Sequence, residues 1–203
     1  MKLKDFFRSV TFRCIVVLAA IAILSGAILS LLNDLLYVSA DEVLQRTINK
    51  IYTEETVAIA ETIVDPDSEE AVAAGEYGSV GSAYRMENGQ YLVEATGRGG
   101  YKGGTVTAYT AFNVENGALT GIYKVVITGN VSQSFISEMD NEYLSHYTTE
   151  KANGIVSGSE YFSTADSDYI VTGATMVANA TNNAVNAGMY FLRTQVLGAG
   201  QEA

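Results

Sequence analysis

The stretch of residues 105–127, TVTAYTAFNVENGALTGIYKVVI, is typical of a β-hairpin. Two runs rich in Thr, Val, Tyr and Ile flank Asn116-Gly117, and Asn-Gly is the strongest short-range signal for a tight hairpin turn because both residues tolerate positive φ. The same pattern occurs upstream, where residues 83–86 and 91–95 flank Asn88-Gly89. Two consecutive hairpins predict an antiparallel sheet of at least four strands, which can bury one face and be stable on its own.

Apolar residues at helical spacing follow the predicted sheet. Residues 135–144 predict one helix, and residues 174–197 predict a second. The second helix has a narrow face of small and apolar side chains, made of Val177, Ala180, Ala184, Ala187, Gly188 and Phe191. Strands followed by helices, without strict β-α alternation, indicate an α+β domain. We place this domain at residues 76–197, with a tail at 198–203.

The N-terminal region has the charge pattern of a membrane anchor. Residues 1–13 hold four basic residues against one acidic residue, and the twenty residues 14–33 carry no charge. As a helix these twenty residues would extend roughly 30 Å, which is the thickness of the bilayer core. The positive-inside rule keeps the basic tail 1–13 in the cytoplasm and places the rest of the chain on the outer face. The alternative is a cleaved secretory signal, because Val38-Ser39-Ala40 has small residues at the spacing that signal peptidase prefers.

Residues 34–75 are predicted to be a juxtamembrane helical segment. Asp41 is a suitable N-cap, and apolar residues recur at helical spacing from Val43 to Tyr52. The acidic stretch 65–70 contains the only proline and is interpreted as a loop or a helix start.

Composition excludes several classes of function. The 203 residues include 12 Lys and Arg against 23 Asp and Glu, a formal net charge of -11, which argues against nucleic-acid binding by phosphate neutralisation. With one cysteine, Cys14, and one histidine, His146, the chain lacks the residues for a disulfide framework, a Cys-rich zinc site or an iron–sulfur cluster. Redox chemistry would therefore require a borrowed cofactor.

The segment 168–177, DYIVTGATMV, is the part of the sequence that suggests chemistry. It is interpreted as an extended run ending in a Thr-Gly turn, in which Thr172 can cap the following helix and Thr175 lies in the first turn. Free N–H groups and the positive end of the helix dipole favour an anion such as a phosphate there. The alternative interpretation is a capped helix start without a ligand.

The tetrapeptide Thr172-Gly173-Ala174-Thr175 resembles the Ser/Thr-Gly-Ala-Thr signature of the FMN-binding domain found in the Rnf electron transport complex and in the related sodium-translocating NADH:quinone reductase. Residues 99–106, GGYKGGTV, are similar to the family's Gly-Tyr-x-Gly segment, which also precedes a strand. The resemblance covers about residues 10–195. It implies an FMN bound through a phosphoester to Thr175, with Thr172, Gly173, Ala174 and Tyr101 also at the cofactor.

Two departures from the family pattern affect this expectation. Family members usually have Asp three positions before the Ser/Thr of the signature, where this chain has Tyr169, while Asp168 is one residue too early. In place of the family's Glu-Thr-Pro-Gly-Leu-Gly loop stand residues 128–135, TGNVSQSF. There Thr128 and Gln133 are candidates to hydrogen-bond the isoalloxazine or the phosphate, and an ordinary polar loop is the alternative.

The resemblance implies a membrane-anchored, covalent FMN-carrying electron-transfer subunit of an Rnf-type ion-translocating ferredoxin:NAD oxidoreductase. Such a chain is an electron carrier rather than an enzyme by itself, in the bacterial cytoplasmic membrane with its C-terminal domain outside. The expected partners are a flavin transferase and other membrane and redox subunits, which the anchor and the small-residue helix face would contact. Two alternatives remain open: a flavoprotein of another extracytoplasmic electron-transfer chain, and an anchored binding or sensor domain without flavin.

Overall fold

The computed structural model describes residues 10–36, 40–53, 55–68 and 70–198. The chain divides into two compact units, residues 1–45 and 46–203, and the boundary falls within helix α3 (Ala40–Ile51). Most of the predicted basic tail, Val38 and Ser39 of the candidate cleavage site, and most of the C-terminal tail lie outside the described residues.

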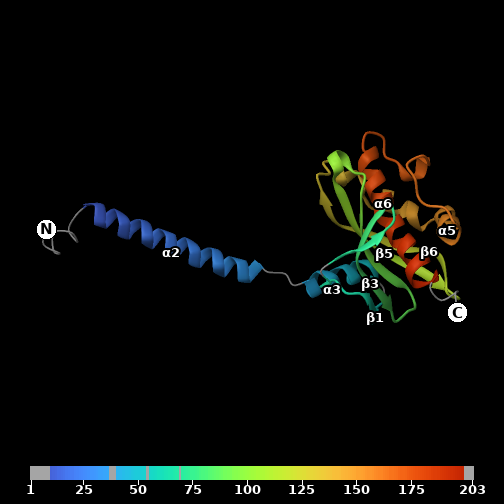
Figure 1. Ribbon diagram of the computed structural model, residues 1–203, viewed down its shortest axis with the longest axis horizontal. Coiled ribbons are helices and arrows are strands. Elements are labelled where there is room, and N and C mark those ends of the chain that lie inside the picture. The colour runs from blue at the N-terminus through green and yellow to red at the C-terminus, as the bar shows by residue number, and fades with distance from the viewer. Residues whose placement is uncertain (1–9, 37–39, 54, 69, 199–203) are drawn as a thin grey trace. The chain divides into compact units, whose positions relative to one another are not determined.

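The first unit contains the long helix α2 (Val10–Leu36) (Figure 1). Within it, residues Phe12–Leu32 have a mean hydropathy of 2.8 and are long and apolar enough to cross a membrane. The 27 residues of α2 correspond to about 40 Å of helix. The expected N-terminal apolar helix is therefore present, and its length and composition fit both a membrane span and a signal sequence.

The second unit is built on one antiparallel sheet in the order β1-β3-β4-β5-β6, with β2 paired to β3 as well. Its strands are β1 (Ile59–Val64), β2 (Val72–Ala74), β3 (Gly78–Met86), β4 (Tyr91–Gly97), β5 (Thr105–Glu115) and β6 (Ala118–Val131). The α+β class and the antiparallel sheet are confirmed. The four strands of the predicted hairpins are β3, β4, β5 and β6, which lie side by side with β6 at one edge.

Both Asn-Gly turns lie where the sequence predicts them. In the β5–β6 turn Asn116 has φ 53° and Gly117 has φ 77°, the pair of positive φ angles that a type I′ turn requires. The β3–β4 turn uses a single positive φ at Gly89, and the Met86 backbone nitrogen donates to the Gln90 carbonyl at 2.8 Å. Each turn therefore sets the register of its hairpin.

The predicted helical segment 34–75 requires correction. Helix α3 ends at Ile51, and the remainder of the segment contains the two strands β1 and β2. The stretch 65–68 between these strands is a turn, in which the Ser68 backbone nitrogen donates to the Asp65 carbonyl at 3.1 Å. The second compact unit therefore begins near Arg46 rather than at residue 76.

Helix α6 (Thr175–Phe191), continued by the π-helical turn η5 (Leu192–Val196), packs across β3, β4 and β5 (Figure 1). Its small-residue face is buried in the core formed with the sheet. The approach is closest at Gly97, where an added Cβ would overlap the backbone of α6. The expectation that this face contacts neighbouring membrane subunits is therefore wrong, because the chain's own sheet covers it.

The single helix predicted over residues 135–144 is replaced by short pieces. These are η2 (Ile136–Glu138), α4 (Asn141–Ser145), η3 (His146–Thr148) and α5 (Glu150–Ser157). Asp140 caps α4 by accepting from the Tyr143 backbone nitrogen at 3.0 Å, and Thr149 caps α5 by accepting from that of Ala152 at 3.2 Å. Each cap begins a new helix, so the apolar residues are distributed over several short helices.

Candidate functional site

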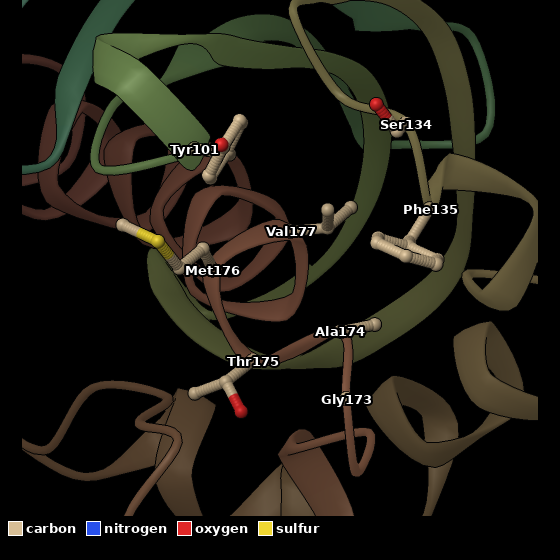
Figure 2. Close-up of a pocket in the computed structure, with 8 residues that line it drawn as sticks. All are labelled: Tyr101, Ser134, Phe135, Gly173, Ala174, Thr175, Met176 and Val177. Atoms are coloured by element: carbon tan, nitrogen blue, oxygen red, sulfur yellow. The ribbon is translucent and has the colours of Figure 1, made fainter.

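A pocket of about 520 Å³ lies at the N-terminal end of α6. Figure 2 shows the side chains that line it, contributed by three segments that are far apart in the sequence. The lining residues are Tyr101, Ser134, Phe135, Gly173, Ala174, Thr175, Met176 and Val177. The fold thus brings together the Gly-Tyr segment, the loop after β6 and most of the Thr-Gly-Ala-Thr signature.

The helix start at the pocket has no side-chain cap. A turn precedes it, with the Ala174 backbone nitrogen donating to the Val171 carbonyl at 2.9 Å and Gly173 at φ 85°. Ala174 occupies the N-cap position and has no side-chain acceptor, so the expected capping by Thr172 is wrong. Thr172 is exposed and does not line the pocket. The N–H groups of the first turn of α6 therefore lack the usual capping oxygen at the positive end of the helix dipole.

Thr175 is the first residue of α6, and its side chain is exposed at the margin of the pocket. In Figure 2 its hydroxyl points away from Tyr101 and Phe135, which lie on either side of Val177. Within the described part of the chain, its Oγ1 takes part in no hydrogen bond. The hydroxyl is thus accessible for modification while its residue belongs to the pocket wall.

Tyr101 begins the short helical turn η1 (Tyr101–Gly103), within which Lys102 takes φ 51°. The Gly104 backbone nitrogen donates to the Tyr101 carbonyl at 2.9 Å, and Gly103 takes φ 75°. The ammonium group of Lys102 lies 5.2 Å from the centre of the Tyr101 ring. The Tyr101 side chain remains 48% exposed and forms one wall of the pocket.

The structure places the two loop candidates, Thr128 and Gln133, away from the cavity. Thr128 is exposed on β6, and Gln133 is only 5% exposed behind the pocket wall. The Gln133 amide is used internally, with Oε1 accepting from the Tyr101 backbone nitrogen at 3.2 Å and Nε2 donating to the Val131 carbonyl at 2.9 Å. The neighbouring residues Ser134 and Phe135 face the pocket instead, and Phe135 is 56% exposed.

Four asparagines on α6, at positions 179, 182, 183 and 186, connect the helix to the surrounding loops. On one side, Asn179 donates to the Gly99 carbonyl at 3.1 Å and Asn183 to the Arg98 carbonyl at 2.7 Å, so α6 holds the loop that carries Tyr101.

On the other side, Asn182 donates to the Tyr169 carbonyl at 2.9 Å, and Asn186 both donates to and accepts from the backbone of Phe162. Sequence reasoning missed these residues. Their i, i+3, i+4, i+7 spacing in an otherwise apolar helix was the available signal.

Tyr169 occupies the position at which the family pattern has Asp, and Asp168 precedes it; the two residues have separate structural roles. Tyr169 is fully buried, with its ring centre 4.8 Å from that of Phe162 and 5.5 Å from that of Tyr147. The exposed carboxylate of Asp168 is paired with Lys151 at 2.8 Å. Position 169 thus belongs to the core that supports the signature, and the nearby acid faces solvent.

The pocket wall is electrically neutral. Its lining contains no carboxylate and no cationic side chain, and Tyr101 is its only ionisable residue. Among the described residues, no group of three or more His, Cys, Asp or Glu side chains could hold a metal ion. The wall therefore provides apolar surface, aromatic rings and the end of a helix, and no acid–base pair.

Comparisons of the chain with protein-family models, with curated proteins and with solved structures found no match.

Proposed function

We propose that this chain carries FMN, bound through a phosphoester to Thr175, and serves as a membrane-anchored electron-transfer subunit of an Rnf-type ion-translocating ferredoxin:NAD oxidoreductase. One observation carries the proposal. A single pocket joins Thr175, Tyr101 and Phe135 at the N-terminal end of α6, although these residues lie far apart in the sequence.

The residues present fit a flavin nucleotide. The volume of about 520 Å³ lies within the range of roughly 300–1,000 Å³ that is typical of small-molecule sites. The exposed rings of Tyr101 and Phe135 offer flat apolar surfaces to an aromatic ring system. The uncapped first turn of α6 favours a phosphate by about 0.3–1 kcal/mol. Together these features match the two parts of FMN, a planar ring and an anion.

Attachment needs a flavin transferase. In a balanced reaction, the Thr175 hydroxyl gives up its proton, its oxygen bonds to the FMN phosphorus, and the bond between that phosphorus and a leaving group breaks. A dinucleotide such as flavin adenine dinucleotide provides this leaving group as adenosine monophosphate. Because the Thr175 Oγ1 is exposed and has no hydrogen-bond partner among the described residues, it can reach an external enzyme.

Bound FMN supplies the electron-transfer chemistry, while the protein holds and orients it. The neutral pocket wall holds no acid–base pair among its lining residues, which supports a carrier that passes electrons between partner subunits rather than an enzyme with its own substrate.

The apolar helix Phe12–Leu32 supports a single membrane anchor. The basic residues before it favour a cytoplasmic N-terminus, which would place the FMN-carrying unit outside the bacterial cytoplasmic membrane. In this arrangement, other membrane and redox subunits of the complex would deliver and accept the electrons.

In-gel flavin fluorescence under denaturing conditions tests the attachment. The chain is co-expressed with a flavin transferase, and wild type is compared with Thr175→Val and with the matched control Thr172→Val. Thr172 is also exposed and belongs to the same tetrapeptide, but it does not line the pocket. We expect fluorescence in wild type and Thr172→Val and a dark band for Thr175→Val. Dark bands in all three would contradict covalent flavin and favour the binding or sensor domain.

A further inference from the structure

We propose that Gln133 is a positioning residue that sets the separation between the Tyr101 and Phe135 walls of the pocket, and so determines whether a planar ring fits between them. As far as the ligand is concerned, this inference rests on the proposed function. The role of Gln133 in placing Tyr101 does not, and it can be measured without flavin.

The Gln133 amide joins the two loops that form the opposite walls. Its Oε1 accepts from the backbone nitrogen of Tyr101 at 3.2 Å, across 32 positions of sequence. Its Nε2 donates to the carbonyl of Val131 at 2.9 Å, which closes its own loop just before Ser134 and Phe135. Because one amide holds both loops, a change at Gln133 alters the position of one wall relative to the other.

The glycines of the Gly-Tyr segment leave space for this amide. An added Cβ at Gly100 or at Gly104 would overlap the Gln133 Nε2 atom. Gly104 is buried and takes φ -70°, so its small size, and not an unusual backbone angle, is what the packing requires. Two glycines of the Gly-Gly-Tyr-Lys-Gly-Gly segment, Gly100 and Gly104, thus leave the space that the buried Gln133 side chain occupies.

The hydrogen bonds of the amide distinguish a positioning role from simple filling of space, because a side chain of the same size without the Nε2 donor would fill the space equally well. In Gln133→Glu a carboxylate can still accept from the Tyr101 backbone nitrogen, but it cannot donate to the Val131 carbonyl. A protonated glutamic acid restores the donor, and burial near carbonyl oxygens raises the pKa of such a carboxyl. Gln133→Glu should therefore hold the Tyr101 and Phe135 loops less firmly than wild type at neutral pH. The wild-type arrangement of the two loops should return as the pH falls.

The first experiment measures the Tyr101 turn itself by limited trypsin digestion of the full chain in detergent. Lys102 and Arg98 are exposed cleavage sites in the loop that Gln133 holds. We expect cleavage after Lys102 to be about three- to tenfold faster in Gln133→Glu than in wild type. Losing the hydrogen bond to the Val131 carbonyl, and placing a carboxylate against that carbonyl, moves the side chain away from the Tyr101 backbone nitrogen and loosens the loop by about the effect of one hydrogen bond.

The matched control is Gln90→Glu at the opposite end of β4, where Gln90 Nε2 donates to Asn113 Oδ1 at 2.7 Å. This control should be cleaved after Lys102 at the wild-type rate. If Gln133→Glu fails to fold, Gln133→Met, which has similar volume and no charge, takes its place. Wild-type cleavage rates in a folded Gln133 variant would overturn the proposal.

The second experiment measures flavin emission of the native, flavinylated protein, which stacking on Tyr101 should quench. Gln133→Glu should be brighter than wild type near neutral pH and return toward the wild-type value below about pH 5, while Gln90→Glu follows wild type at both. Brightness that stays at the wild-type value at every pH would refute the link to the ligand. If wild type carries no flavin, the proposed function fails, and the trypsin rates still decide the role of Gln133.

Discussion

Asn182→Ala tests how the signature segment is held against α6. Asn182 is 1% exposed, and its amide donates to the Tyr169 carbonyl at 2.9 Å and accepts from the Tyr147 hydroxyl. Alanine removes these two bonds, each worth about 0.5–1.5 kcal/mol, and a longer one at 3.5 Å from the Tyr143 hydroxyl to Asn182 Oδ1. The Tyr143 hydroxyl lies 3.2 Å from the Tyr169 carbonyl and 3.2 Å from the Tyr147 hydroxyl, so neither of these two groups is left without a hydrogen-bond partner. Because alanine is smaller than asparagine, it also leaves part of the buried space unfilled. We therefore expect a loss of about 2–4 kcal/mol in the free energy of unfolding.

The neighbouring Asn183→Ala is the control. Asn183 is half-buried and makes one hydrogen bond, to the Arg98 carbonyl at 2.7 Å, so its loss should cost only about 0.5–1.5 kcal/mol. The assay is urea unfolding of the full chain in detergent, followed by near-ultraviolet circular dichroism, because the chain has 13 tyrosines and no tryptophan. Equal costs for the two variants, or a cost below about 1 kcal/mol for Asn182→Ala, would refute this account of the support under the signature.

The remaining predictions use the same assay. Gly97→Ala should lower the free energy of unfolding by about 1–3 kcal/mol or more, because the added methyl group overlaps the backbone of α6. Gly81→Ala is the control and should change the free energy of unfolding little, because its methyl group has room. Similar values for the two variants would argue against the close approach of Gly97 to α6. Burial raises the pKa of Tyr143 to about 12 and raises that of Tyr147 well above its ordinary value. The native state therefore keeps protons that the unfolded chain releases near pH 10, so stability should be complete below about pH 10 and fall by roughly 1.4 kcal/mol per pH unit for each tyrosine up to its folded pKa. A constant urea midpoint from about pH 9 to 11 would contradict this.

The central hairpins were predictable because their turns are encoded locally. Asn116-Gly117 tolerates the positive φ angles of a type I′ turn, and the runs rich in β-branched residues on either side of it favour strands. Strand β1 was missed because only its last residue is buried and it therefore shows no clean alternation of apolar and polar residues. As an edge strand it is defined by pairing with β3, which is a non-local contact.

The error over residues 135–144 has a different cause. Apolar spacing alone predicted one helix, while Asp140 and Thr149, both good N-cap residues, divide the region into separate short helices. The predicted cap at Thr172 failed in the same way, because the turn closed by Gly173 moves the helix start to Thr175. Helix boundaries depend on which of several capping residues is used, and packing decides between them.

The candidate site was predictable in its parts and not in its assembly. Local rules placed Thr175 in the first turn of a helix and Tyr101 in a glycine-rich turn. Their meeting at one pocket depends on α6 lying across β4, which is a tertiary contact. The inward orientation of Gln133 depends on the space left by Gly100 and Gly104. The sequence therefore predicts a ligand contact at Gln133, whereas its amide bonds to the two loops that form the pocket walls.

The most direct measurement is the mass of the Thr175-containing peptide from the full chain isolated after co-expression with a flavin transferase. We expect an increase equal to the mass of FMN less one water, with tandem fragmentation locating the added group on Thr175. An unmodified peptide, or a flavin located on Thr172 or another residue, would contradict it.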